Sequence, residues 1–88
     1  MEFQFEPGRI WAEDKAGRVT AEVLFPDENG TAVITRTVVD SSLRGRGVAN
    51  LLLEAAVSHI RADGKKAKPV CSYAVKWFED HPKQGDLL

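Results

Sequence analysis

The chain has 88 residues, of which 43% are hydrophobic and 28% are charged, and its formal net charge is −1. This composition is typical of one small globular domain covering residues 1–88, and it excludes an intrinsically disordered chain. Without an overall basic field, nucleic acid is not the expected partner. No apolar run approaches the ~20 residues of a membrane span.

The sequence contains a single cysteine and two histidines. One cysteine cannot form an internal disulfide, and the start of the chain has no signal-peptide pattern, so we expect a cytoplasmic protein. The spacing of these residues matches no metal-ligand pattern, and no metal is predicted.

The first forty residues are predicted to form an antiparallel meander. Alternating apolar residues and β-branched runs separated by turn residues are typical of short strands. Asn29-Gly30 is the strongest hairpin signal in the chain. The predicted strands are 3–5, 9–13, 19–25 and 31–39.

The pattern then changes to helical spacing. Apolar residues recur at helical intervals over 48–60, and Gly64 is placed to cap that helix at its C-terminus. A short strand is predicted at 66–70, followed by a second helix that starts at Ser72 as its cap and runs to about residue 81. Residues 84–88 are predicted to form a loose tail. The order ββββ-α-β-α predicts an α+β fold of the broader α/β class.

The most informative segment joins the fourth predicted strand to the first helix. Glycines allow the backbone to turn tightly and to approach a ligand closely, and free N–H groups at a helix start bind phosphate oxygens. Two arginines add positive charge at the same place. We therefore predict a phosphate or pyrophosphate site; a simple helix start with solvated arginines and a contact with nucleic acid are the alternatives. The predicted site residues are Arg44, Gly45, Arg46, Gly47, Val48 and Ala49.

The spacing Arg44-x-x-Gly47-x-Ala49 resembles the signature of the GNAT superfamily of N-acetyltransferases. The segments Pro69–Tyr73, His81-Pro82 and Asp86–Leu88 are similar to elements of a short subfamily of these proteins. The resemblance implies a minimal GNAT-like fold without the N-terminal helices of larger relatives. It also implies binding of acetyl-CoA as co-substrate and transfer of acetyl to an amine of unknown identity, on a small molecule or a protein.

The resemblance also implies roles for the fourth strand. In these proteins the pantetheine arm of the coenzyme pairs with the exposed backbone here, at Thr37, Val38 and Val39. Two departures bear on catalysis: Arg36 and Val38 occupy positions that usually hold histidine and an acidic residue. Asp40 and Glu22 are the nearest remaining carboxylates.

Cys71 lies between a predicted strand end and a helix start. The resemblance places it beside the thioester, where it would line the coenzyme or carry the acetyl group in a ping-pong reaction. A small, buried and inert thiol is the simpler alternative. Phe78 occupies a position that often holds a tyrosine acid, and phenylalanine cannot donate a proton.

A second function remains open at this stage. The missing acidic residue and phenol favour a non-catalytic module that binds coenzyme A, or a protein or nucleic acid, on the same scaffold. An exposed edge strand also favours a homodimer.

Overall fold

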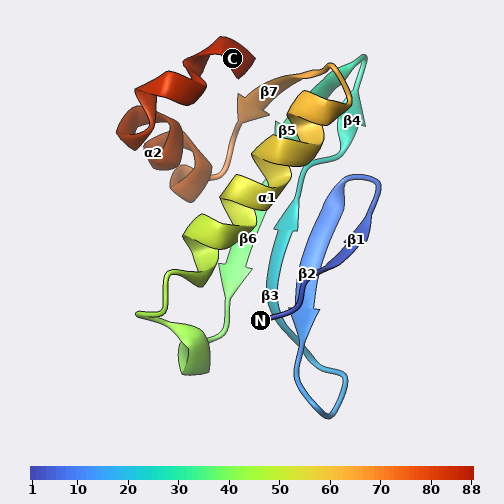
Figure 1. Ribbon diagram of the computed structural model, residues 1–88, viewed down its shortest axis with the longest axis vertical. Helices are drawn as coiled ribbons and strands as arrows, with labels where there is room; N and C mark the ends of the chain where they lie inside the picture. The colour runs from blue at the N-terminus through green and yellow to red at the C-terminus, as the bar shows by residue number, and fades with distance from the viewer.

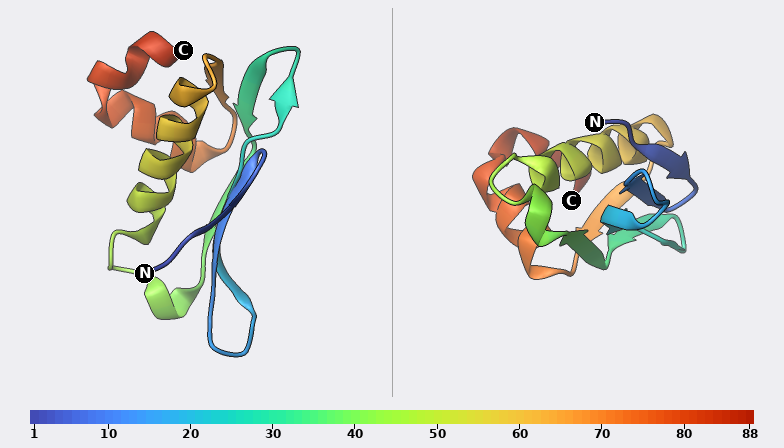
Figure 2. Two further views of the ribbon diagram at one scale, coloured as in Figure 1. Left: turned by 45° about the vertical axis from the view of Figure 1, so that its right-hand side comes forward. Right: turned by 90° about the horizontal axis from the view of Figure 1, so that it is seen from below.

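The computed structural model describes all 88 residues. Seven strands and two α-helices, with two short 3₁₀ segments, form two layers, and both helices lie on one side of the strands (Figures 1 and 2). Neither α-helix combines the length and the apolar character needed to cross a bilayer. In chain order the elements are β1 (Gln4–Glu6), β2 (Arg9–Glu13), β3 (Val19–Leu24), β4 (Asp27–Glu28), β5 (Thr31–Ile34), β6 (Arg36–Val39), η1 (Ser41–Leu43), α1 (Val48–Ala62), β7 (Lys66–Pro69), α2 (Ser72–Asp80) and η2 (Pro82–Leu87).

The larger sheet has the strand order β1-β2-β3-β6 and is antiparallel throughout. Side chains alternate between its two faces, as the sequence pattern predicts. Ile10 and Val23 are fully buried on the inner face, where α1 packs with Leu52 and Leu53. The outer face carries the partly exposed residues of the same strands, and no helix covers it (Figure 2).

The predicted strand 31–39 is wrong in one respect, because it is two strands in two sheets. Thr31–Ile34 forms β5, which pairs in parallel with β7, whereas Arg36–Val39 forms β6 and pairs with β3. The chain changes partner at Thr35, whose N–H donates to Leu24 O at 3.0 Å. A run of β-branched residues fits both strands equally well and does not mark the break.

The predicted Asn29-Gly30 hairpin is confirmed. Both residues have positive φ, 54° and 87°, and they connect β4 to β5 as a two-residue loop. The predicted end of the first helix is also confirmed, because Gly64 follows the helix with φ 69°. The hairpin contributes Asp27 to an ion pair with Lys65, at 3.1 Å.

The prediction of a loose tail is wrong. Residues 82–87 form η2, and Leu87 is buried in the core. Arg61 Nη1 lies 2.7 Å from Asp86 Oδ2, and Lys66 Nζ donates to the Asp86 carbonyl. These contacts hold the tail against α1 and β7.

Candidate functional site

The turn between η1 and α1 depends on two glycines in the left-handed region. Gly45 has φ 81° and Gly47 has φ 71°. A Cβ at either position would meet no atom within 4 Å, so the backbone conformation rather than lack of space requires glycine. Gly47 is the N-cap of α1 and offers no side-chain acceptor to the first turn.

The amides of this turn are left free as a consequence. Leu51 N, donating to Gly47 O at 3.1 Å, makes the first hydrogen bond of α1. The six preceding N–H groups, from residue 45 to residue 50, donate to no other group of the chain. At a helix start such groups carry partial positive charge and favour an anion.

Two exposed arginines next to these amides add full positive charges to the partial charges of the N–H groups. Neither Arg44 nor Arg46 forms an ion pair with a carboxylate. A hollow of about 210 Å³ runs beside the turn, between Val39, Leu43 and Val48. The arrangement can hold an anion on the free amides while an apolar chain continues toward β6.

The edge of β6 continues from this turn. Asp40 N donates to Thr20 O at 2.7 Å, and Val38 lies opposite Glu22. In an antiparallel pair, the backbone groups of successive residues point alternately toward the partner strand and away from it. The N–H and C=O groups of Val38 therefore point to β3, whereas those of Thr37 and Val39 point to the free edge. The Val39 side chain packs against the core, whereas Val38 is 40% exposed on the outer face.

Cys71 lies across this free edge, at the N-terminus of α2. Its N–H donates to Ile34 O at 3.1 Å, and its Sγ lies 3.4 Å from Thr37 Oγ1. The predicted cap is wrong, because the N-cap is Cys71 and not Ser72, and the Cys71 side chain makes no capping hydrogen bond. No histidine or carboxylate is hydrogen-bonded to this thiol.

Three other residues that the sequence analysis named, Phe78, Asp40 and Glu22, lie away from the glycine turn or are engaged by neighbouring side chains. Phe78 is buried in the core. The Asp40 side chain accepts from the hydroxyl and N–H of Ser42, which lowers the pKa of Asp40 below its ordinary value. Glu22 Oε2 lies 2.7 Å from Arg9 Nε on the outer face.

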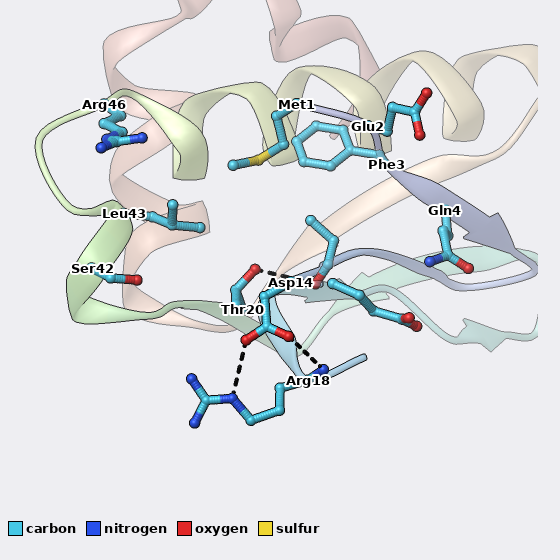
Figure 3. A pocket seen from close by; sticks show the side chains of 12 residues that line it. Met1, Glu2, Phe3, Gln4, Asp14, Arg18, Thr20, Ser42, Leu43 and Arg46 are labelled. Atoms are coloured by element: carbon cyan, nitrogen blue, oxygen red, sulfur yellow. Dashed lines mark hydrogen bonds and ion pairs between the residues drawn. The ribbon is translucent and has the colours of Figure 1, made fainter. Parts of the chain in front are cut away.

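The largest hollow, about 880 Å³, opens on the other side of the glycine turn. Figure 3 shows Arg46 at its rim with Ser42 and Leu43, and Met1 and Phe3 facing them from the first residues of the chain. Asp14 and Arg18 close its far end with an ion pair at 3.1 Å. The wall combines apolar and charged side chains and shares Arg46 with the turn.

Sequence reasoning missed Asn50, which lies in the first turn of α1. Its Oδ1 accepts from the buried Trp77 indole N–H at 2.7 Å, and this bond joins α1 to α2. His81 stacks on the Trp77 ring with 4.1 Å between centroids. The two bonded residues are 27 positions apart, and no local pattern signals the pair.

A family model described as GCN5-related N-acetyl-transferase matches residues 9–87. The chain belongs to this family. The predicted GNAT resemblance is thereby confirmed, and the match covers nearly the whole chain. No group of three or more His, Cys, Asp or Glu side chains in this chain is arranged so that it could hold a metal ion.

Solved structures agree with this assignment. A small GCN5-like protein from Staphylococcus aureus is 28% identical, with a TM-score of 0.80 over 98% of this chain and 85% of that one. This similarity confirms the predicted α+β fold. No curated protein matches the chain.

Larger GNAT proteins share the fold at lower identity. A GNAT-family N-acetyltransferase from Escherichia coli, in complex with CoA, is 20% identical with a TM-score of 0.64, over 77% of this chain and 42% of that one. The ribosomal-protein-S18-alanine N-acetyltransferase from the same organism is 14% identical with a TM-score of 0.66, over 89% and 50%. This chain therefore spans about half the length of these proteins or less.

Proposed function

We propose that this protein binds acetyl-CoA and transfers the acetyl group to an amine. The observation that carries the proposal is the run of free amides from residue 45 to residue 50, next to Arg44 and Arg46. This arrangement favours a pyrophosphate. Membership of the GCN5-related family supports the same ligand.

The backbone geometry indicates how the bound coenzyme would run from the glycine turn to its thioester. A pyrophosphate held at Gly45 and Gly47 would place the pantetheine arm along the free edge of β6. The amides of Thr37 and Val39 point to that edge and can pair with it as with an added strand. The thioester would then lie next to Thr37 and Cys71, at the N-terminus of α2.

In the proposed reaction the amine attacks the thioester directly. The polar partner of Cys71 Sγ is the Thr37 hydroxyl, and no histidine or carboxylate is hydrogen-bonded to the thiol to act as its base. This contact favours a coenzyme-lining role for Cys71 over a covalent one. The N–H groups of residues 72–74, in the first turn of α2, donate to no backbone acceptor, and in this proposal they would stabilise the developing oxyanion.

The first experiment is a thermal shift with acetyl-CoA on the wild type and on Gly47→Trp. The indole would cover the free amides, so we expect a clear rise in Tm for the wild type and none for the variant. At a ligand concentration of about 100 times Kd, linkage adds about 2.7 kcal/mol of stability.

Gly64→Trp is the matched control for that variant. Gly64 has nearly the same φ, 69°, and equally open surroundings, but it lies at the opposite end of α1. It carries the same backbone strain and should keep the full response to acetyl-CoA. No response in the wild type would contradict the proposed function.

A non-catalytic coenzyme binder is the alternative function. The observations that favour it are the exposed Val38, at a position that usually carries an acidic residue, and the buried Phe78. It predicts the same thermal shift as the enzyme, without release of free CoA in the presence of amines. A thiol assay with a panel of amines distinguishes the two.

A further inference from the structure

Two helices bracket the path that the proposed function gives to the coenzyme. The first turn of α1 carries the free amides that would hold the pyrophosphate, and α2 begins beside Thr37 and Cys71, next to which the thioester would lie. The two helices pack against each other on one side of the strands (Figures 1 and 2). The distance between these two helix ends therefore has to match the length of coenzyme that joins the pyrophosphate to the thioester.

A single hydrogen bond joins α1 to α2. Trp77 Nε1 donates to Asn50 Oδ1 at 2.7 Å, and no other hydrogen bond or ion pair connects the two helices. A hollow of about 350 Å³ adjoins this bond, with Asn50 on one wall and Tyr73 and Lys76 among the α2 residues on the other. The packing between the helices is open on this side, and the bond bridges it.

Asn50 connects the free amides of the turn directly to this bond. Its backbone N–H is the last of the six free amides. Its side-chain amide is held at both ends, because Nδ2 donates to Glu54 Oε1 at 3.0 Å while Oδ1 accepts from the indole. An indole N–H can only donate and a carboxylate can only accept, so both partners require the same orientation of the amide.

The Trp77 indole is held on the α2 side by two aromatic neighbours. Its side chain is buried, Phe78 packs edge-on against the ring with 5.1 Å between centroids, and His81 stacks on it at 4.1 Å. A displacement of the indole would therefore carry α2 with it. Because Trp77 lies on the short helix whose N-cap is Cys71, a change in the spacing at Trp77 also displaces the N-terminus of α2.

We propose that Asn50 is a positioning residue that sets the separation between the free amides of α1 and the N-terminus of α2. The inference rests on the proposed function. A coenzyme bound at both helix ends acts as a ligand with two linked binding groups, and it gains affinity from the second group only where the spacing fits. Without the bond the two helix ends remain, but one coenzyme no longer meets both in their best geometry.

The test compares a ligand that spans both helix ends with one that reaches only the first. Acetyl-CoA is the long ligand, titrated by calorimetry. ADP, which carries a pyrophosphate without a pantetheine arm, is the short one, titrated by amide chemical shifts. Asn50→Leu should weaken acetyl-CoA binding by about tenfold and change the Kd of ADP by less than about twofold, because the lost hydrogen bond acts on the spacing and not on the amides. Equal losses for the two ligands, or none for acetyl-CoA, would overturn the inference.

Trp77→Phe breaks the same bond from the other side, because it removes the indole donor and keeps an aromatic ring. It should also weaken acetyl-CoA more than ADP. If Asn50 acts through Trp77, a protein with both substitutions should bind acetyl-CoA no more weakly than the weaker of the two single variants. Losses that add up would mean that the two residues act independently, and they would overturn the inference.

Ile10→Val is the control for lost stability. Ile10 is fully buried on β2, two strands away from β6, and shortening a buried isoleucine lowers stability without touching either helix end. Its Kd for acetyl-CoA should equal that of the wild type, and a loss as large as in Asn50→Leu would overturn the inference. A wild type that does not bind acetyl-CoA, or in which ADP leaves the amides of residues 45–50 unshifted, would overturn the proposed function and the inference with it.

Discussion

Cys71 Sγ lies 3.4 Å from Thr37 Oγ1, and this contact joins the N-terminus of α2 to the free edge of β6. It lies next to the point where the chain leaves one sheet for the other at Thr35. The two sheets therefore diverge beside a thiol and a hydroxyl that are in direct contact, and the proposed thioester would lie next to this pair.

The first prediction concerns the route of acetyl transfer. If the amine attacks the thioester directly, Cys71→Ala should retain acetyl transfer within a few-fold of the wild type. Intact-mass measurement of the wild type incubated with acetyl-CoA alone should show no added acetyl group. An acetylated wild-type chain together with an inactive Cys71→Ala protein would instead establish a ping-pong route through the thiol.

The second prediction concerns the bond between Asn50 and Trp77. Replacing Asn50 with leucine leaves the buried indole N–H without an acceptor, and such a loss costs about 1–3 kcal/mol. Denaturant unfolding of Asn50→Leu should show this decrease. Glu54→Ala is the control, since it removes only the exposed bond from Asn50 Nδ2 and should change stability by less than about 0.5 kcal/mol.

The sequence predicts the parts of the fold that depend on local conformation. Gly47 and Gly64 each occupy a positive-φ position at an end of α1, and glycine is the residue that such positions require. The glycine turn, the two ends of α1 and the Asn29-Gly30 hairpin were predictable for this reason. The proposed binding of an anion at the turn rests on the same local rules.

Other features depend on partners that are distant in the sequence. The bond between Arg61 and Asp86 spans 25 positions and joins the docked tail to α1. The break at Thr35 follows from the choice of β7 and β3 as separate partners for one β-branched run. Glu22 belongs to this class too, because only the strand register places it beside Val38.

The third prediction uses the single tyrosine of the chain. Burial, and secondarily the charge of Asp80, raise the pKa of Tyr73 above its ordinary value of 10. Ultraviolet absorbance of the phenolate should therefore show a midpoint above that of free tyrosine, and Asp80→Asn should move it slightly down. Because the folded state holds this proton more tightly, stability should fall as the pH rises above about 10.

A phenolate midpoint at or below the ordinary value would contradict this prediction. The matched control is Asp86→Asn, which removes a carboxylate of η2 that does not contribute to the raised pKa of Tyr73, and it should leave the midpoint in place. At neutral pH the phenol keeps its proton, so Tyr73 remains a hydrogen-bond donor on the exposed side of α2.

The last prediction concerns the docked tail. The hydrogen bond from Arg61 lowers the pKa of Asp86 below its ordinary value. A carboxylate with a lowered folded pKa contributes stability that is fully present above its unfolded pKa of about 3.9 and is lost as pH falls through the folded value. Asp86→Asn should therefore be less stable than the wild type at pH 7. The urea midpoints of the two proteins should converge as the pH is lowered below the pKa of Asp86 in the folded state. Asp80→Asn, which removes the carboxylate of an exposed pair with Lys76, should show a smaller difference at pH 7. A difference for Asp86→Asn that persists unchanged in acid would mean that the tail is held by the burial of Leu87 rather than by the ion pair.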